Sequence, residues 1–247
     1  MSISRPYRRT CRQFVDGSYP KWQYITHPKF AQSPDHYVRA FLLLLKDLQE
    51  LFDYVEPADR NLACYSYRIH ALLLRACIEV EANCKAILKE NGYQKPKMNI
   101  GDYRKIEATH QLASYQVRVP SWSGDQWLRT PFSAWATPNE PLPWYEAYNA
   151  TKHDRHHSFA AATFEHLLDA SCGLLVLLSS QFNTYDFPSG DILLSVGRSN
   201  DSFESGIGSF FRVKFPSNWP MEQRYEFNWQ ELEDEEDPFI TFDYTRV

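Results

Sequence analysis

Residues 68–88, RIHALLLRACIEVEANCKAIL, contain the clearest helical pattern in the chain and therefore decide its fold class. Apolar side chains recur every three or four residues along this stretch, which is the spacing of one buried face of an α-helix. We expect the helix to start near Asp59 and to reach about Glu90. Gly92 is expected to end it, since glycine readily adopts the left-handed conformation found just after a helix. The residues of the apolar face are Ile69, Leu73, Ala76, Val80, Cys84 and Ile87.

The segments on either side predict further helices. Upstream, Ser33 and Pro34 are residue types that favour a helix N-cap and a first helical position. Apolar residues at helical spacing follow them, and Pro57 ends this pattern. Downstream, a helical pattern begins at Pro143, bends at residues 156–158 and continues as a broad apolar run to residue 182. Together these patterns predict a mainly α fold, an antiparallel bundle of four to five helices over residues 33–181.

The remaining segments differ in composition from the helical ones. Residues 92–142 are rich in proline and tryptophan and predict a long connection that includes one short helix near residues 103–113. The C-terminal appendage, residues 182–247, contains the short segments ILLSVG, SFFRVKF, RYEFNW and FITFDY, which predict a small antiparallel β element. Between the last two segments, ELEDEEDP is expected to form a solvated hairpin loop.

Residues 1–32 are interpreted as an N-terminal arm. Its tip is basic, and we interpret it as a solvated terminus in preference to an arm that contacts phosphates. The charged residues of this tip are Arg5, Arg8, Arg9 and Arg12.

The composition narrows the function classes. A formal net charge of −5 over 247 residues argues against a generally basic nucleic-acid coat. No stretch is apolar over the length needed to span a bilayer, and the first residues lack the apolar segment of a secretory signal. The five cysteines are odd in number and never spaced as CxxC, so the sequence predicts neither a disulfide framework nor a zinc site. We therefore expect a cytoplasmic protein that has no membrane contact.

Residues 148–157, YNATKHDRHH, form the strongest candidate site. On a continuous helix His153 and His157 would share a face with Asn149, because residues four apart are neighbours. Three interpretations stay open. His153 and His157 could bind a metal, although the glutamate of an HExxH motif is absent. A histidine and a nearby cation could cleave RNA without a metal, because RNA supplies its own 2′-hydroxyl nucleophile. The cluster could also only cap and pack a helix end.

The helical pattern and this cluster together resemble a HEPN domain, a family of helical bundles. The resemblance covers residues 33–181 and implies a bundle that usually dimerises. It also implies either a metal-independent ribonuclease of toxin–antitoxin, abortive-infection or antiphage systems, or an inactive binding module. Active members carry an arginine, then four to six residues, then a histidine. The residue directly after the arginine is often asparagine. Asn149 and His153 match this pattern, whereas Tyr148 stands where the arginine would be. The arginines that could replace it in space are Arg68, Arg75 and Arg155.

From this resemblance we expect a homodimer with an RNA-directed role in a defence or toxin context. The alternative is a non-catalytic scaffolding module that binds a protein partner or an antitoxin. His153 is the expected general base or acid, Asn149 the orienting group and Arg155 the catalytic cation. A pair between Arg75 and Glu79 is favoured over a catalytic role for Arg75. No cofactor is expected, since the chain has no glycine-rich phosphate loop. The expected substrate-binding residues are Lys152, Asp154, His157 and Arg75.

Overall fold

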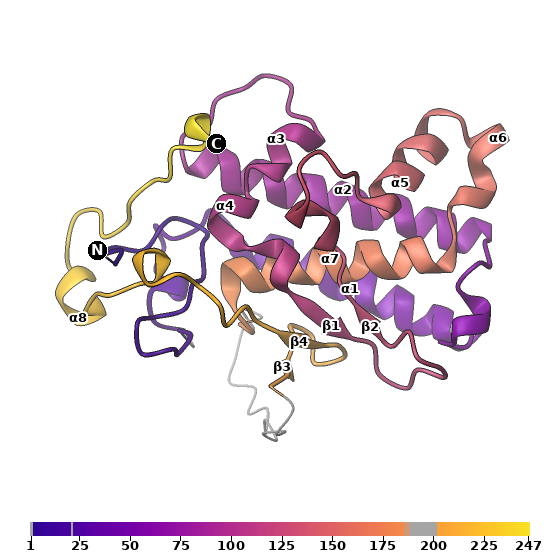
Figure 1. Cartoon of the computed structure of the whole chain (residues 1–247), viewed down its shortest axis with the longest axis horizontal. Coiled ribbons are helices and arrows are strands. Elements are labelled where there is room, and N and C mark those ends of the chain that lie inside the picture. Colours follow the sequence, from indigo (N-terminus) through magenta and orange to yellow (C-terminus); the bar gives the residue numbers. More distant parts are fainter. Residues whose placement is uncertain (1, 21, 186, 188–201) are drawn as a thin grey trace.

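About half of the residues that the computed structural model describes are helical, and the described residues are 2–20, 22–185, 187 and 202–247. The prediction of a mainly α protein with a small antiparallel β element is confirmed (Figure 1). The short helix expected near residues 103–113 is present as two pieces, α3 and α4. The helices are α1 (Pro34–Phe52), α2 (Tyr67–Glu90), α3 (Ile100–Arg104), α4 (Glu107–His110), α5 (Pro143–His153), α6 (Arg155–Ser158), α7 (Phe164–Phe182) and α8 (Trp229–Leu232).

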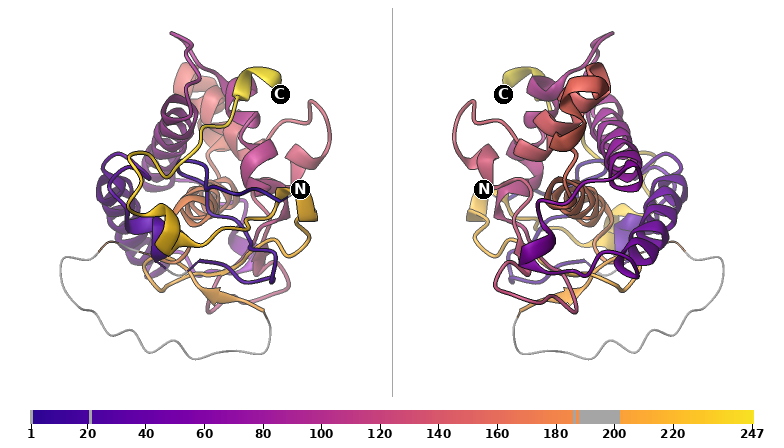
Figure 2. Two further views of the ribbon diagram at one scale, coloured as in Figure 1. Left: turned by 90° about the vertical axis from the view of Figure 1, so that its left-hand side faces the viewer. Right: turned by 90° about the vertical axis from the view of Figure 1, so that its right-hand side faces the viewer.

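The core of the bundle is formed by α2 and α7, with α1 and α5 packed against both. Nearly every residue of α7 is buried, as the broad apolar run predicts. Helices α2 and α7 run in the same direction, because backbone hydrogen bonds join their starts: Phe164 donates to Cys64 at 2.8 Å. Helix α5 runs the opposite way, with Tyr145 near Glu81 and its C-terminal end near His70. Figure 2 shows α7 surrounded by the other long helices.

Both ends of α2 are closed by local interactions. The side chain of Ser66 accepts a hydrogen bond from the Ile69 N–H at 3.1 Å, so α2 begins later than the expected start near Asp59. At its other end Gly92 has φ 87° and donates to the Lys89 carbonyl at 3.0 Å. The next residue, Tyr93, donates to Leu88 at 2.9 Å. This pair of bonds is a Schellman motif, so the prediction for Gly92 is confirmed.

Helix α1 has the predicted proline at its first position but a different cap. Ser33 precedes Pro34 in a left-handed conformation, with φ 49°, and its side chain makes no capping hydrogen bond. The helix ends at Phe52, before Pro57 is reached.

The small sheet joins two segments that are far apart in the sequence. Its strands are β1 (Gln116–Arg118), β2 (Leu128–Arg129), β3 (Glu204–Ser205) and β4 (Arg212–Lys214), paired antiparallel in the order β2-β1-β4-β3. β4 lies within the predicted strand SFFRVKF, but its neighbour β1 comes from the irregular connection. The C-terminal segment therefore does not form a sheet on its own.

The other strand predictions for the C-terminal segment differ from the structure. RYEFNW and FITFDY make only isolated bridges, from Tyr225 to Ile3 and Phe14 and from Ile240 to Tyr7. The ELEDEEDP segment includes the end of α8 and is not a hairpin loop. ILLSVG lies outside the described residues.

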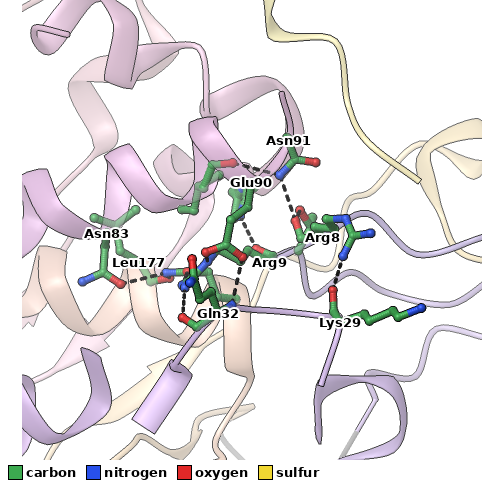
Figure 3. A network of polar contacts seen from close by, with 12 residues as sticks. Arg8, Arg9, Lys29, Gln32, Asn83, Glu90, Asn91 and Leu177 are labelled. Carbon is green, nitrogen blue, oxygen red and sulfur yellow. Dashed lines mark hydrogen bonds and ion pairs between the residues drawn. The ribbon is translucent and has the colours of Figure 1, made fainter. Parts of the chain in front are cut away.

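The N-terminal segment is part of the folded core. The interpretation of its arginines as part of a solvated terminus is therefore wrong for Arg9 and Arg12. Both side chains are buried. The guanidinium of Arg9 lies 2.7 Å from a carboxylate oxygen of Glu90 and donates to the side chain of Gln181 at 2.9 Å and to the Gln32 carbonyl at 2.6 Å (Figure 3). Arg12 donates to the Thr109 carbonyl at 2.9 Å. Buried charges need such partners. The partners of Arg9 attach the N-terminal segment to α2 and α7, and the partner of Arg12 attaches it to α4.

Among the described residues, no helix combines the length and the apolar character needed to cross a membrane.

Candidate functional site

The candidate cluster lies at the junction of α5 and α6, where one residue interrupts the helix. Asp154 ends α5, with its N–H donating to the Ala150 carbonyl at 2.9 Å. It also begins α6, where its carboxylate accepts a hydrogen bond from the His157 N–H at 3.3 Å. Aspartate is well suited to this N-cap role. The predicted bend therefore begins at Asp154, and α7 starts only at Phe164, after a short 3₁₀ helix at Phe159–Ala161.

This interruption separates His157 from the α5 histidine. The prediction that Asn149, His153 and His157 share one helix face is wrong for His157, which belongs to α6. Its Nδ1 atom lies 3.0 Å from each carboxylate oxygen of Asp154, and both side chains are exposed. Asp154 thus holds His157 and the start of α6, whereas no contact joins it to His153 among the described hydrogen bonds.

His153 and Asn149 keep their spacing on α5. His153 is the last residue of the helix and is exposed, and Asn149 is half-buried one turn earlier. An exposed imidazole at a helix end is accessible to a large substrate. Metal binding receives no support, because the part of the chain that the structure describes holds no group of three His, Cys, Asp or Glu side chains arranged to bind a metal ion.

Lys152 turns back along α5 towards Tyr148. Its Nζ donates to the Tyr148 hydroxyl at 2.9 Å and lies 4.8 Å from the centre of that ring. The hydrogen bond to Tyr148 raises the pKa of Lys152, with the charge of Glu81 on α2 as a weaker cause. Tyr148, which stands where the HEPN resemblance would place an arginine, is buried. Lys152 is therefore paired within the bundle, and its predicted role towards a substrate would require it to leave the phenol.

Arg75 does not reach the candidate site. Its guanidinium forms an ion pair with Asp47 of α1, which replaces the expected pair with Glu79. Arg68 is held by the same α1 helix, 3.3 Å from carboxylate oxygens of Asp47 and Glu50. Neither Arg68 nor Arg75 therefore takes the place of the arginine that the HEPN resemblance would put at position 148.

Arg155 is exposed on α6 and lies close to a histidine that the sequence patterns did not indicate. His70, on α2, is buried, and its Nε2 atom has no hydrogen-bond partner. Burial lowers the pKa of His70, and the positive charge of Arg155 lowers it further. The ring of His70 lies 5.5 Å from that of Phe159. The lowered pKa favours the neutral form of His70, which packs against Phe159 directly after α6.

Two exposed tyrosines lie beside α6. Tyr65 and Tyr67 are 53% and 71% exposed, and both contact the ring of Phe159, at centroid distances of 5.7 and 4.6 Å. Phe159 directly follows α6, so both tyrosines lie next to the C-terminal end of this helix. The sequence contained a signal for them: the tandem YSY at residues 65–67 places two large aromatic residues at a polar helix start. We refer to Tyr65, Tyr67, His153, Arg155, His156 and His157 as the basic tip.

The basic tip combines cationic, imidazole and aromatic side chains on one end of the bundle, at the upper right of Figure 1. Residues 152–157 contain two permanent cations, three imidazoles and one carboxylate, and that carboxylate is paired with His157. The fold and this chemistry are the grounds on which a function can be inferred. No protein-family model, curated protein or solved structure matches the chain.

Proposed function

We propose that the chain has an RNA-directed role in which the basic tip holds a single-stranded segment of RNA. The observation that carries this proposal is the pair of exposed tyrosines, Tyr65 and Tyr67, next to the cationic end of α6. Single-stranded nucleic acid is held in general by cations along its phosphates and by aromatic rings that stack on its bases. Both kinds of group are present at this end of the bundle.

The electrostatics of the tip support binding of a polyanion despite the net charge of −5. A local field depends on the nearest charges, and residues 152–157 carry two permanent cations, Lys152 and Arg155, against the single carboxylate of Asp154. The exposed Arg155 and Lys152 supply permanent positive charge. The tip therefore differs in sign from the chain as a whole.

His153 is the proposed catalytic residue if the bound RNA is also cleaved. It would take the proton of a 2′-hydroxyl, whose oxygen attacks the adjacent phosphorus. The bond to the 5′-oxygen breaks, that oxygen takes up a proton, and a 2′,3′-cyclic phosphate remains. Arg155 would stabilise the negative charge that develops on phosphorus, and Asn149 would orient the phosphate. The HEPN resemblance adds a homodimer and a defence or toxin context to this proposal.

A non-catalytic interaction module is the second candidate. It is favoured by Tyr148, a buried residue whose hydroxyl is occupied by Lys152 and which offers no positive charge at the position of the family arginine. Under this proposal the tip binds its partner and leaves it intact.

A binding and cleavage experiment separates these candidates. Fluorescence anisotropy with labelled single-stranded RNA is measured for the wild type, for Arg155→Ala and for Trp22→Ala. Trp22 is an exposed aromatic residue of the N-terminal segment, which Figure 1 shows at the other end of the molecule, and serves as the control. We expect weaker binding in Arg155→Ala only, with an affinity that falls as salt rises. Equal binding by all three proteins would contradict the proposal.

Cleavage is followed in EDTA with mixed cellular RNA, for the wild type and for His153→Ala. Products that form in EDTA and disappear in His153→Ala would support the ribonuclease. Intact RNA together with tip-dependent binding would support the non-catalytic module.

A further inference from the structure

The N-terminal and C-terminal segments enclose a pocket of about 860 Å³ at the end of the molecule opposite the basic tip. Figure 1 shows these segments at the left, and the rings of Tyr24 and His27 in the N-terminal segment contact that of Trp229, the first residue of α8. This volume is within the range of small-molecule sites, about 300–1,000 Å³. Six of the fourteen described lining residues are aromatic: Phe14, Tyr19, Trp22, Tyr225, Phe227 and Trp229.

The walls of this pocket are fixed by backbone pairing. The Val15 N–H donates to the Tyr225 carbonyl at 3.0 Å, and the Tyr225 N–H donates to the Gln13 carbonyl at 3.0 Å. These bonds hold Phe14 and Phe227 with ring centroids 5.2 Å apart. The Tyr225 hydroxyl donates to the buried Thr10 carbonyl at 3.1 Å, which fixes the ring itself. The backbone pairing and the Tyr225 hydroxyl therefore fix the aromatic surface.

The polar lining combines hydroxyl groups that have hydrogen-bond partners, three amide side chains and three carboxylates. Tyr19 donates to the Pro216 carbonyl at 2.7 Å, so its ring face is the group left to contact a ligand. Asp16, Glu226 and Glu233 are exposed carboxylates of the lining. Hydrogen bonds from Ser18 lower the pKa of Asp16 and keep it ionised. The described lining residues include no lysine or arginine.

Aromatic faces attract cations through the negative potential above the ring. Tryptophan attracts a cation more strongly than tyrosine or phenylalanine does. Two tryptophans belong to this pocket. Trp22 is 62% exposed at its surface, and Trp229 is half-buried and packs 5.7 Å from Phe239. Carboxylates beside such rings add attraction for positive charge and would repel phosphate groups. A neutral apolar ligand would use the rings and gain nothing from the carboxylates.

We propose that this pocket binds a small organic cation, one that carries an alkylated ammonium group. Its alkyl surface packs against Phe14, Phe227 and Trp229, and its charge lies near Asp16, Glu226 and Glu233. We refer to the six aromatic lining residues together with Asp16, Glu226 and Glu233 as the acidic pocket. This ligand class is independent of the RNA-directed role, because the acidic pocket and the basic tip share no residue and have opposite charge.

The test is isothermal titration calorimetry of the full chain with choline at millimolar concentration. Three other probes are titrated alongside it: the uncharged isostere of choline, in which carbon replaces the ammonium nitrogen; potassium chloride; and sodium acetate. We expect choline to bind at least about tenfold more tightly than the isostere, a difference of about 1.4 kcal/mol. Potassium and acetate should give no binding heat. Equal binding of choline and its isostere, or no binding of choline, would overturn the proposal.

Two variants locate the site. Glu233→Gln removes one charge from an exposed position and keeps the shape of the side chain, so it leaves the fold intact. Trp229→Ala removes one wall. Both should weaken choline binding several-fold, whereas Arg155→Ala, at the basic tip, should leave it unchanged. Unchanged choline binding in folded Glu233→Gln and Trp229→Ala would place the ligand elsewhere and overturn the assignment.

Discussion

The basic tip and the acidic pocket both combine exposed aromatic rings with charge, but the charge has opposite sign and the two regions are built differently. The tip comes from one short stretch, residues 153–157, together with two tyrosines at the start of α2. The pocket needs two segments about as far apart as the chain allows, residues 14–23 and 225–233. A locally encoded surface tolerates loss of distant contacts. A pocket closed by the two ends of the chain depends on whatever holds those ends in place.

The largest expected effect comes from the buried ion that fastens the N-terminal segment. Arg9→Ala leaves Glu90 and Gln181 without their partner, and breaking a buried charge pair in this way costs about 3–5 kcal/mol of unfolding free energy. Urea denaturation followed by circular dichroism measures this loss. Choline binding should be lost at a lower urea concentration than RNA binding, because only the acidic pocket includes the N-terminal segment.

Arg5→Ala is the matched control for that variant. Its pair with Glu235 is about one-third exposed on both sides, and such surface pairs contribute about 0–1 kcal/mol. Similar losses in the two variants would show that the buried network of Arg9 is not what holds the segment.

The double variant Tyr65→Ala with Tyr67→Ala tests the aromatic half of the basic tip. Stacking of a base on an aromatic ring contributes about 1–3 kcal/mol, so affinity for single-stranded RNA should fall at least about tenfold. Anisotropy with the labelled RNA measures the change, and choline binding in the acidic pocket should remain as in the wild type. RNA binding that survives the double substitution would mean that the tip does not use its tyrosines.

Acid should weaken the end of the molecule that contains the N-terminal segment. His110 is fully buried against the Arg9 carbonyl, at 2.9 Å, and burial lowers its pKa to about 3. The unfolded chain takes up this proton below about pH 6.5, and the folded chain only near pH 3. The stabilising contribution is therefore complete above pH 6.5 and is lost as the pH falls towards 3, by at most about 1.4 kcal/mol per pH unit.

The contribution of Glu107 to the unfolding free energy changes with pH in the opposite direction, so it must be separated from that of His110. Burial raises its pKa to about 7, so its contribution is complete below about pH 4.5 and is lost as the pH rises towards 7. The slope of unfolding free energy against pH is therefore compared between wild type and His110→Gln below pH 4.5. Identical slopes would show that His110 is not the group responsible.

The smallest effect is expected at the junction of α5 and α6. Asp154→Ala removes the N-cap of α6 and the partner of His157, and loss of such a cap costs about 1 kcal/mol. Asp154→Asn keeps an acceptor for the His157 N–H and should lose only a part of this. Thermal unfolding of both variants measures the difference. If both variants were as stable as the wild type, α6 would not depend on its cap.

The sequence by itself determined the helices and the chemistry of the candidate cluster. The seam of α2, the left-handed Gly92 that ends it and the start of α5 at Pro143 are local features, because spacing and caps act within a few residues. The exposed His153 and Arg155 likewise lie on the segment in which the sequence indicated them. Their proposed roles remain predictions.

The tertiary structure alone decided what the charged residues pair with. Arg75 pairs with Asp47 on another helix, although Glu79 on its own helix has the spacing for a pair, and Arg9 is buried although its neighbours suggest a solvated arm. The partner of β4 is β1, about a hundred residues earlier, and Tyr225 pairs with Phe14 across almost the whole chain. No local pattern encodes such contacts, since they depend on how the bundle brings the two ends of the chain together. The histidine and arginine residues of the basic tip were therefore visible in the sequence, whereas the packing of Tyr65 and Tyr67 on Phe159 and the acidic pocket exist only in the folded protein.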